Sequence, residues 1–280
     1  DVVGQSGVAE ATMFETHAHT RPFSPDAIQS LDELVASASA LGFAGTVATE
    51  HMDPDLGQGE MWFDLDDFFA AMTSARSALP DGFRLLNGIE AGYQSHLADR
   101  YRDMTATHPF DHVIGSVHAL RGDDIYFVQD VFLEGRETAY GAYLDALIEM
   151  ASSGRWFDVL GHYDYVARFS GYAEPLLTYR EQPDRFDRLF RQIIANGQAL
   201  ELNARSIRAM ERVGLRDPMP DPDIFLRYRE LGGDLIAVGS DAHATNEVGL
   251  YRSRIRDYLL GLGFRRTFVY IDRSPVDIPL

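Results

Sequence analysis

Short apolar segments alternate with amphipathic ones along most of the chain, and this alternation constrains the fold more than any other feature of the sequence. The apolar segments are predicted to be strands at residues 11–14, 45–49, 83–89, 111–117, 156–161, 199–202 and 235–239. Helices are predicted between them at 31–41, 65–79, 95–107, 136–153, 184–196 and 221–231, followed by a helix near 250–260 and a strand at 267–271. Strands that alternate with helices form right-handed βαβ units with parallel strands. The sequence therefore predicts an α/β fold built on a mainly parallel sheet.

Polar side chains that can do chemistry follow the predicted strands, at the point where each strand ends. They are His17, His19, His51, Glu90, His118, His162, Asn203, Asp241 and His243. Six of the nine histidines belong to this set. Because the carboxyl ends of the strands meet on one face of an α/β barrel, the pattern favours a barrel with its functional site on that face. A doubly wound open sheet is the alternative, but its ligands would gather at a single crevice.

The first predicted strand runs directly into two histidines separated by one residue. Side chains alternate along an extended chain, so His17 and His19 are expected to lie on the same side of the backbone. Two imidazoles on one side of a rigid strand can hold one metal ion, and imidazole suits Zn, Fe and Mn. An isolated His-X-His motif is also found on protein surfaces. Only the further His, Glu and Asp residues at later strand ends make a catalytic metal site the better interpretation.

No linker and no internal repeat interrupts the pattern, so we expect residues 13–280 to form a single domain. Residues 1–12 are expected to be a leader or tag-like extension, because the sequence begins at Asp1 without a methionine. No apolar run approaches the length of a membrane span, and no signal peptide is visible. The expected location is the cytoplasm.

Composition excludes several kinds of chemistry. The chain has no cysteine and all 25 of its basic residues are arginine, so thiolate catalysis, Schiff-base chemistry and a carbamylated-lysine metal bridge are excluded. The net charge of −18 argues against a nucleic-acid or anionic-membrane surface, where phosphate would be repelled. An anionic substrate would need local positive charge from bound metals or from clustered arginines.

The strand-end motifs resemble those of the polymerase-and-histidinol-phosphatase (PHP) metalloesterases, and among them the monofunctional histidinol-phosphate phosphatases. The matching motifs, in family order from residue 14 to about 249, are Thr16-His17-Ala18-His19-Thr20, Thr49-Glu50-His51, Gly88-Ile89-Glu90, Ile114-Gly115-Ser116-Val117-His118, Val159-Leu160-Gly161-His162, Glu201-Leu202-Asn203 and Gly239-Ser240-Asp241-Ala242-His243. The resemblance implies a distorted seven-stranded β/α barrel, a PHP-type relative of the TIM barrel, with a site for two to three divalent ions such as Zn, Mn or Fe.

The resemblance also implies which residues hold each ion. The first ion would be held by His17, His19, Glu90 and Asp241, and the second by Glu90, His118 and His162. The third would be held by His51, His243 and one more ligand shortly after the first motif, for which Asp26 is the nearby candidate with a small shift of spacing. Relatives commonly carry histidine near the position of Asp26. An ordinary helix-capping role for Asp26 is an equal alternative.

Three arginines follow two of these motifs and are candidates for binding phosphate. Arg168 lies shortly after His162, and Arg205 and Arg208 follow the sixth predicted strand. Guanidinium groups suit bidentate binding of phosphate, and relatives carry phosphate-contacting arginines in these loops. Solvated surface arginines are the alternative.

The expected activity is hydrolysis of L-histidinol phosphate to L-histidinol and phosphate, by water activated by the divalent ions and without a covalent phosphoenzyme. Arg168 would stabilise charge on the phosphoryl group, and Asp241 or His243 could pass a proton to the leaving alkoxide. The acidic, aromatic loop 53–63 could meet the substrate's ammonium and imidazole groups, or could be a solvated lid. A small phosphorylated molecule is thus the expected partner, and nucleic acid and membrane are not.

Three other functions remain possible at this point. A PHP enzyme that acts on a nucleotide or another small phosphate ester is the first alternative. An amidohydrolase barrel would also begin with a His-X-His motif, although the members with a carbamylated lysine are excluded. A regulatory metal-binding module would be expected to have lost ligands, yet nearly every motif position still holds one. The sequence does not predict an oligomeric state.

Overall fold

Seven parallel strands form one sheet in the computed structural model, which describes residues 13–57 and 59–280. In spatial order they are β1 (Phe14–Glu15), β2 (Gly45–Met52), β3 (Arg84–Gly92), β4 (His112–Ser116), β7 (Val159–Leu160), β8 (Ala199–Asn203) and β9 (Ile236–Gly239). Every neighbouring pair is parallel, and the spatial order follows the chain. The predicted parallel α/β sheet is therefore confirmed. The extension expected over residues 1–12 lies outside the described residues.

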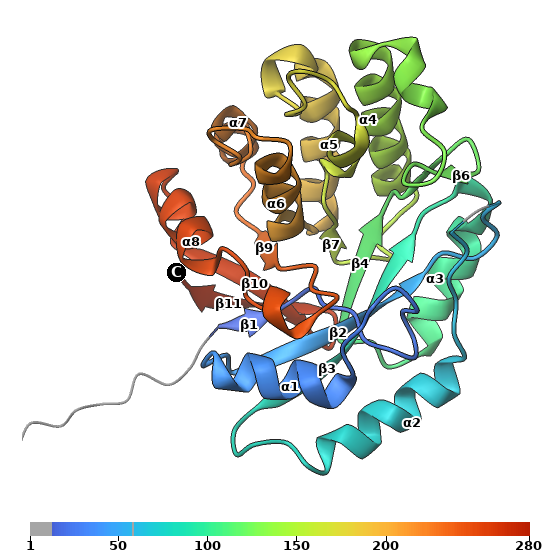
Figure 1. Ribbon diagram of the computed structural model, residues 1–280, viewed down its shortest axis with the longest axis vertical. Coiled ribbons are helices and arrows are strands. Elements are labelled where there is room, and N and C mark those ends of the chain that lie inside the picture. Colours follow the sequence, from blue (N-terminus) through green and yellow to red (C-terminus); the bar gives the residue numbers. More distant parts are fainter. Residues whose placement is uncertain (1–12, 58) are drawn as a thin grey trace, which may run out of the picture.

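The sheet curls into a nearly closed barrel because the segments that follow β1 and β9 meet (Figure 1). Ala18 and Ala242 form an isolated parallel bridge. The backbone N–H of Asp241 donates to the carbonyl of His17 at 2.8 Å, and the N–H of His19 donates to the carbonyl of Ala242 at 2.8 Å. The expected seven-stranded barrel is confirmed, and its seam is made by residues of the first and last sequence motifs.

Helices cover the outside of the barrel, with α1 and α2 on one side of the view in Figure 1 and α4 to α7 on the other. They are α1 (Leu31–Ala40), α2 (Leu65–Arg76), α3 (Ala98–Thr107), α4 (Arg136–Ser152), α5 (Pro183–Asn196), α6 (Ala204–Arg212), α7 (Pro222–Glu230) and α8 (Arg252–Gly261). Short 3-10 turns lie at η1 (Ser95–Leu97), η2 (Asp130–Glu134), η3 (Tyr165–Phe169), η4 (Tyr179–Glu181) and η5 (Thr245–Glu247). Ser30 and Glu33 form a reciprocal capping box that fixes the start of α1.

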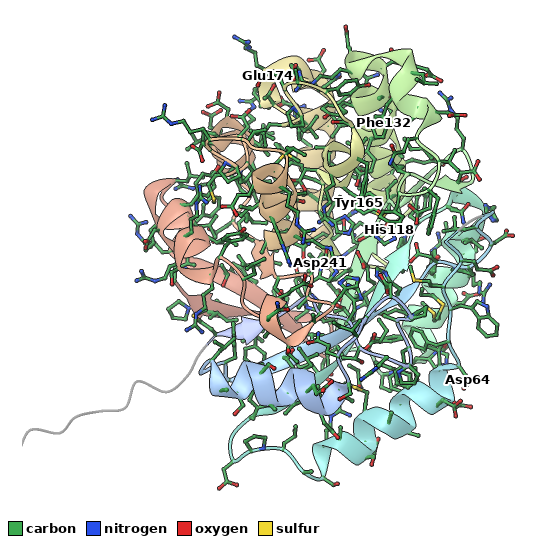
Figure 2. The ribbon with its side chains drawn as sticks, viewed as in Figure 1. Asp64, His118, Phe132, Tyr165, Glu174 and Asp241 are labelled. Atoms are coloured by element: carbon green, nitrogen blue, oxygen red, sulfur yellow. The ribbon has the colours of Figure 1, made fainter. Side chains whose placement is uncertain are left out.

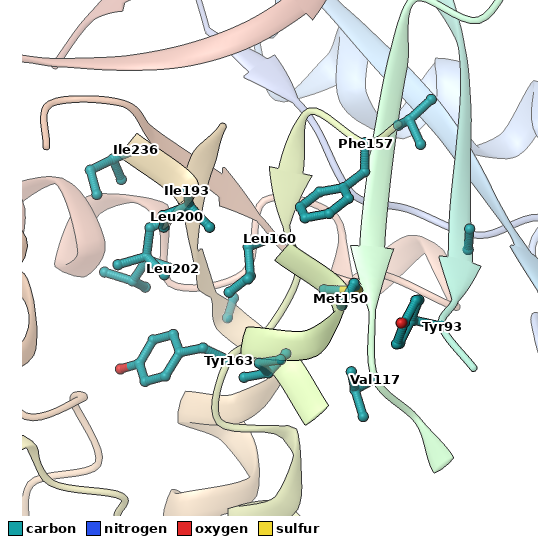
Figure 3. Packing of buried hydrophobic residues seen from close by; sticks show 14 of the residues in the cluster. Tyr93, Val117, Met150, Phe157, Leu160, Tyr163, Ile193, Leu200, Leu202 and Ile236 are labelled. Carbon is teal, nitrogen blue, oxygen red and sulfur yellow. The ribbon is translucent and has the colours of Figure 1, made fainter. Parts of the chain in front are cut away.

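Alternation along the strands separates the barrel interior from the layer beneath the helices. Val159 of β7 and Ala199 of β8 pack in one buried cluster, whereas their neighbours Leu160 and Leu200 pack in another with Ile193 of α5. Figure 3 shows Leu160, Leu200 and Ile193 in this outer layer. Period-two alternation thus gives each strand two apolar faces. Such burial on both faces holds the strand ends in fixed positions.

An antiparallel hairpin closes the amino end of the barrel. It consists of β10 (Arg266–Ile271) and β11 (Ser274–Pro279). Val269 and Ile278 pack against residues of β2 and β3, and Tyr270 packs against residues of β4, β7, β8 and β9. The sequence predicted the first of these strands but not the second. The reason is the turn, in which Asp272 and Arg273 both have positive φ, at 49° and 61°, without a glycine to signal it.

Two further elements were not predicted from the sequence. Helix α6 begins directly after β8, because the side chain of Asn203 accepts hydrogen bonds from the backbone N–H groups of Arg205 and Ser206. The short hairpin of β5 (Ala119–Leu120) and β6 (Asp123–Asp124) follows β4. Both elements lie at the carboxyl ends of the strands, where they form walls around the site. None of the helices in the described part of the chain is long and apolar enough to cross a membrane.

Candidate metal centre

Six of the nine predicted strand-end residues line a cavity of about 870 Å³ at the carboxyl ends of the strands, namely His51, Glu90, His118, His162, Asp241 and His243. Figure 2 labels His118, Tyr165 and Asp241, which all line this cavity. The ligand candidates come from the ends of β1, β2, β3, β4, β7 and β9 or from the segments that follow them, because parallel strands present their carboxyl ends at one rim. The structure therefore brings together the candidates that the sequence motifs separate by more than 200 residues.

The first group joins the ends of β1, β3 and β9. Oε2 of Glu90 lies 3.3 Å from Nε2 of His17 and 3.5 Å from Nε2 of His19. Oδ1 of Asp241 lies 3.4 Å from Nε2 of His19 and 4.0 Å from Nε2 of His17. Asp241 has a positive φ of 56°, a conformation that aspartate tolerates better than most residues. Strained backbone of this kind is often found at functional sites.

The second group uses the other oxygen of Glu90. Oε1 of Glu90 lies 2.7 Å from Nε2 of His162 and 3.2 Å from Nε2 of His118. The two imidazole nitrogens are 3.3 Å apart. Ser116 donates a hydrogen bond to the same oxygen at 2.6 Å, which fixes the carboxylate between the two groups.

The third group lies on the side of the cavity near the loop after β1. Nε2 of His51 is 3.4 Å from Nε2 of His243, and Oδ2 of Asp26 is 3.0 Å from His243 and 3.7 Å from His51. Asp26 is 46% exposed, whereas both imidazoles are buried. Because Ser30 is the N-cap of α1, the alternative interpretation of Asp26 as the cap of that helix is wrong.

Several buried polar atoms in these groups have no hydrogen-bond partner among the described residues. Nε2 of His17, Nε2 of His19 and Oε2 of Glu90 are all in this state, and they face one another. Buried polar atoms are normally satisfied, so three converging unsatisfied donors and acceptors call for a further group between them. Imidazole nitrogens and carboxylate oxygens are ligands for divalent transition metals. The residues present therefore fit metal ions.

Burial and mutual charge shift the pKa values of these groups strongly. Burial raises the pKa of Glu90, but the positive charges of His17, His118 and His162 outweigh it and hold the pKa well below its usual value. Burial also lowers the pKa of His19, and the neighbouring His51 lowers it further. The carboxylates are therefore held in the ionised form, which is the form that binds a cation.

Glu201 is a residue whose role the sequence did not assign. It lies in β8, and its Oε1 is 2.6 Å from Nδ1 of His17. Its Oε2 accepts the backbone N–H of His162 at 2.7 Å and the side-chain amide of Asn203 at 3.1 Å. A carboxylate behind an imidazole ligand fixes which nitrogen carries the proton and which faces the metal. Alternation along β8, which points Glu201 and Asn203 to the same side, was the available signal.

All three candidate arginines line the cavity. Arg168 is buried and donates to Oδ2 of Asp241 at 3.0 Å, to Oδ1 of Asn203 at 2.9 Å and to Oγ of Ser206 at 3.0 Å. Arg205 donates to Oε2 of Glu247 at 3.3 Å, and Arg208 pairs with the same carboxylate. The alternative of solvated surface arginines does not describe Arg168, whose side chain is only 6% exposed.

Another part of the cavity wall is aromatic and acidic. It is built from the loop after β2, from β6 and the segment after it, and from η3, and its residues are Glu60, Met61, Asp124, Tyr126, Phe127, Tyr165 and Phe169. Oδ1 of Asp124 accepts the backbone N–H of Tyr126 at 2.7 Å. Loop 53–63 thus contributes Glu60 and Met61 to the cavity wall. Asp124 and its aromatic neighbours had no recognisable sequence motif.

Comparison with known proteins gives one consistent result. The chain is 28% identical over 239 residues to a probable histidinol-phosphatase of Clostridium acetobutylicum, covering 85% of this chain and 89% of the relative. It is 25% identical over 255 residues to a histidinol-phosphatase of Lactococcus lactis, covering 90% and 91%. A crystal structure of histidinol phosphate phosphatase from Lactococcus lactis, complexed with zinc, L-histidinol and phosphate, superimposes with a TM-score of 0.83 at 22% identity, covering 95% of this chain and 99% of that one.

A sequence model of a protein family also matches this chain, in agreement with the structural similarity and with the strand-end motifs. The model describes the PHP domain and matches residues 15–205. That range includes β1 to β8 and most of the ligand candidates, and the structure places the remaining two, Asp241 and His243, beside them. The chain belongs to the PHP domain family.

Proposed function

We propose that this protein is a metal-dependent phosphate monoester hydrolase whose substrate is L-histidinol phosphate. The observation that carries the proposal is the convergence of three ligand groups on one cavity that is also lined by a buried arginine. The relatives named histidinol-phosphatase match over nearly their whole length, which supports the same chemistry here. The product pair would be L-histidinol and inorganic phosphate.

The three groups are proposed to hold three divalent ions, with Zn, Mn or Fe as the metals. The first ion would be held by His17, His19, Glu90 and Asp241, the second by Glu90, His118 and His162, and the third by Asp26, His51 and His243. Ligands of a tetrahedral zinc ion at 2.0–2.1 Å lie roughly 3.4 Å apart. The separations of 2.7–4.0 Å between the donor atoms support this assignment.

The ions, when bound, would lower the pKa of the attacking water and neutralise charge on the phosphoryl oxygens. Arg168 would bind a phosphoryl oxygen from the other side. Its three hydrogen bonds to Asp241, Asn203 and Ser206 hold the guanidinium in place before substrate arrives, so little ordering remains to be done at the moment of reaction. Arg205 and Arg208 lie on α6, also at the cavity, and would bind phosphate as it enters or leaves.

Both candidates for passing a proton to the leaving alkoxide, Asp241 and His243, have their side-chain polar atoms engaged by neighbouring residues. Burial raises the pKa of Asp241, but the charges of His17 and Arg168 outweigh it and hold the pKa well below its usual value. His243 has no free nitrogen for this task, because Nε2 faces Asp26 and His51, and Nδ1 lies 2.9 Å from the carbonyl of Asp241. Asp241 has one oxygen directed to the first ligand group and the other to Arg168. The second oxygen borders the position proposed for the phosphoryl group.

The aromatic and acidic wall is proposed to bind the organic part of the substrate. Histidinol carries an ammonium group and an imidazole, and both suit a carboxylate surrounded by aromatic rings. Asp124 lies next to Tyr126 and within reach of the hydroxyl of Tyr165 at 3.4 Å. Tyr126 and Tyr165 each pack against Phe169. The negative charge of Asp124 would repel a second phosphate, which counts against nucleoside di- and triphosphates.

The test is a comparison of kcat/KM for L-histidinol phosphate, nucleoside monophosphates and p-nitrophenyl phosphate with the metal-loaded protein. We expect histidinol phosphate to be preferred by well over tenfold. A preference below about tenfold would reject this substrate while leaving the phosphatase activity standing. Absence of phosphate release from all three substrates would reject both. Replacement of Asp124 by Asn should reduce the preference and leave turnover of p-nitrophenyl phosphate largely unchanged.

A further inference from the structure

Asp53 lies directly behind one of the proposed metal ligands. It follows β2, its side chain is 2% exposed, and its Oδ1 is 2.7 Å from Nδ1 of His118. The other nitrogen of His118 faces Glu90 and His162. Both nitrogens of this imidazole are thus engaged, one by a buried carboxylate and one by the ligand group. From the sequence alone, Asp53 has no role beyond membership of the loop after β2.

The contact between Asp53 and His118 has a definite consequence for the imidazole. A carboxylate that accepts the Nδ1 proton leaves the lone pair on Nε2, which is the nitrogen that faces the ligand group. The carboxylate also makes the imidazole more basic and fixes the ring orientation. These effects act on metal affinity and need no contact between Asp53 and the ion.

The backbone around Asp53 is shaped to accommodate this carboxylate. A Cβ placed on Gly92 at the end of β3 would lie 1.7 Å from Oδ1 of Asp53, so only glycine leaves the necessary space. The hydroxyl of Tyr101 donates to the carbonyls of Met52 and Gly92, at 3.1 Å and 2.7 Å, and so ties the two strand ends together. The position of the carboxylate is therefore fixed from both strands.

Asp53 also anchors the loop that forms part of the cavity wall. Its backbone N–H donates to the carbonyl of Met61 at 2.6 Å, and the N–H of Met61 donates back at 3.1 Å. Met61 lines the cavity. Asp53 thus connects the base of this loop, where it pairs with Met61, to the proposed metal ligand His118.

We propose that Asp53 is the positioning residue for His118, and that it sets the affinity of the ion held by Glu90, His118 and His162. The proposal rests on the proposed assignment of His118 as a ligand. Loss of a carboxylate in this position is expected to lower metal affinity about 10- to 100-fold. Gly92 has the accompanying role of leaving room for Asp53.

The test measures metal retention without any substrate, so its outcome is separate from that of the proposed catalytic activity. Metal-loaded protein is equilibrated with graded chelator, and the metal remaining per chain is counted. We expect Asp53→Ala to lose one equivalent at about 10- to 100-fold lower chelator concentration than the wild type. Asp53→Asn should lie between the two, because its amide oxygen still accepts the Nδ1 proton but carries no charge. Gly92→Ala, which keeps the carboxylate but displaces it, should resemble Asp53→Ala.

Asp55→Asn is the matched control. Asp55 belongs to the same loop and also contacts a histidine, with Oδ2 at 2.7 Å from Nε2 of His96, but this pair is exposed and lies outside the ligand groups. It should retain metal like the wild type.

A double variant shows whether Asp53 acts through His118. In the His118→Ala background, which should already have lost this ion, Asp53→Ala should cause no additional loss. Wild-type metal retention in both Asp53→Ala and Gly92→Ala would overturn the proposal. Loss of a further ion when Asp53→Ala is added to His118→Ala would also overturn it, because Asp53 would then act independently of His118.

Discussion

At the scale of single residues, Glu90 has the most demanding position in the molecule. Its side chain is fully buried, and its two carboxylate oxygens face different imidazoles: Oε2 faces His17, His19 and His51, and Oε1 faces His118 and His162. A buried carboxylate without cationic partners would be costly. Its retention in the ionised form depends on the histidines around it and on whatever cations they hold.

Replacement of Glu90 by Ala should abolish turnover and reduce the number of bound metal ions, because the first and second ligand groups both lose an oxygen ligand. Elemental analysis and a phosphate-release assay would measure the two effects, with far-UV circular dichroism to confirm that the fold persists. Wild-type metal content and activity in this variant would contradict the assignment of a shared ligand.

Arg168→Ala should lower kcat/KM by about ten- to a few hundred-fold, since losing a charge-assisted hydrogen bond costs roughly 1.5–3 kcal/mol. The lysine variant should recover only part of this, because it lacks the planar fork. Steady-state kinetics with phosphate as product inhibitor would measure both effects. If kcat/KM and phosphate inhibition are both unchanged, Arg168 does not bind the phosphoryl group, and Arg205 or Arg208 becomes the candidate for this role.

Asp26→Ala should lose one ion per chain and reduce activity without removing the other two ions. Asp26→His should retain that ion and shift its preference towards Zn, because imidazole is a softer ligand than carboxylate. Elemental analysis after purification with each metal in turn would measure this. Two ions in the wild type under every condition, together with full activity of Asp26→Ala, would remove Asp26 from the metal site.

At the scale of elements, the hairpin β10–β11 supports the barrel from the end opposite the ligands. His112 at the start of β4 is part of this support, and its Nδ1 accepts the backbone N–H of Tyr270 at 3.1 Å. Burial, assisted by the charge of His17, lowers the pKa of His112 to about 3. His112 therefore stays neutral in the folded protein at a pH where the unfolded chain takes up a proton.

Acid should weaken the fold through His112. The unfolded chain binds the proton near pH 6.5 and the folded chain only near pH 3, so the free energy of unfolding falls as the pH drops through this window, by at most about 1.4 kcal/mol per pH unit. His112→Asn keeps an acceptor for the backbone N–H of Tyr270 and removes the group that takes up a proton on unfolding. Denaturant unfolding from pH 6.5 to 5 should show a shallower decline in the variant than in the wild type. Because the other histidines are common to both proteins, parallel declines would contradict the prediction.

The sequence predicted most elements and most of the candidate site, and the exceptions have physical reasons. Strand ends could be recognised because apolar runs stop at His, Glu or Asp, and parallel packing then brings those ends together. Helix α6 was missed because its start depends on the cap formed by Asn203, directly at the end of a strand. Asp53 and Asp124 were not recognised because their roles depend on contacts with His118 and with aromatic residues distant in sequence.

At the scale of the whole molecule, a net charge of −18 surrounds a site proposed for an anionic substrate. Arg168, Arg205, Arg208 and Arg212 line one wall of the cavity, and the three on α6 follow a helical spacing that places them on one face. Carboxylates also line the cavity, so the proposed metal ions, together with these arginines, would have to offset the repulsion of the anionic substrate by the molecule as a whole. The same overall charge should keep polynucleotides away from the cavity.

The seam of the barrel joins parts of the chain that are made far apart in time. Thr16 donates to the carbonyl of Val238 across 222 residues of sequence, and the backbones of His17 and Asp241 meet beside it. During synthesis, the first pair of histidines leaves the ribosome long before the aspartate that completes their group. A growing chain that ends before β9 can neither close the barrel nor complete the first ligand group. Barrel closure and completion of that group are therefore a single late event, and a cation bound there would act as a clasp between the two ends of the barrel.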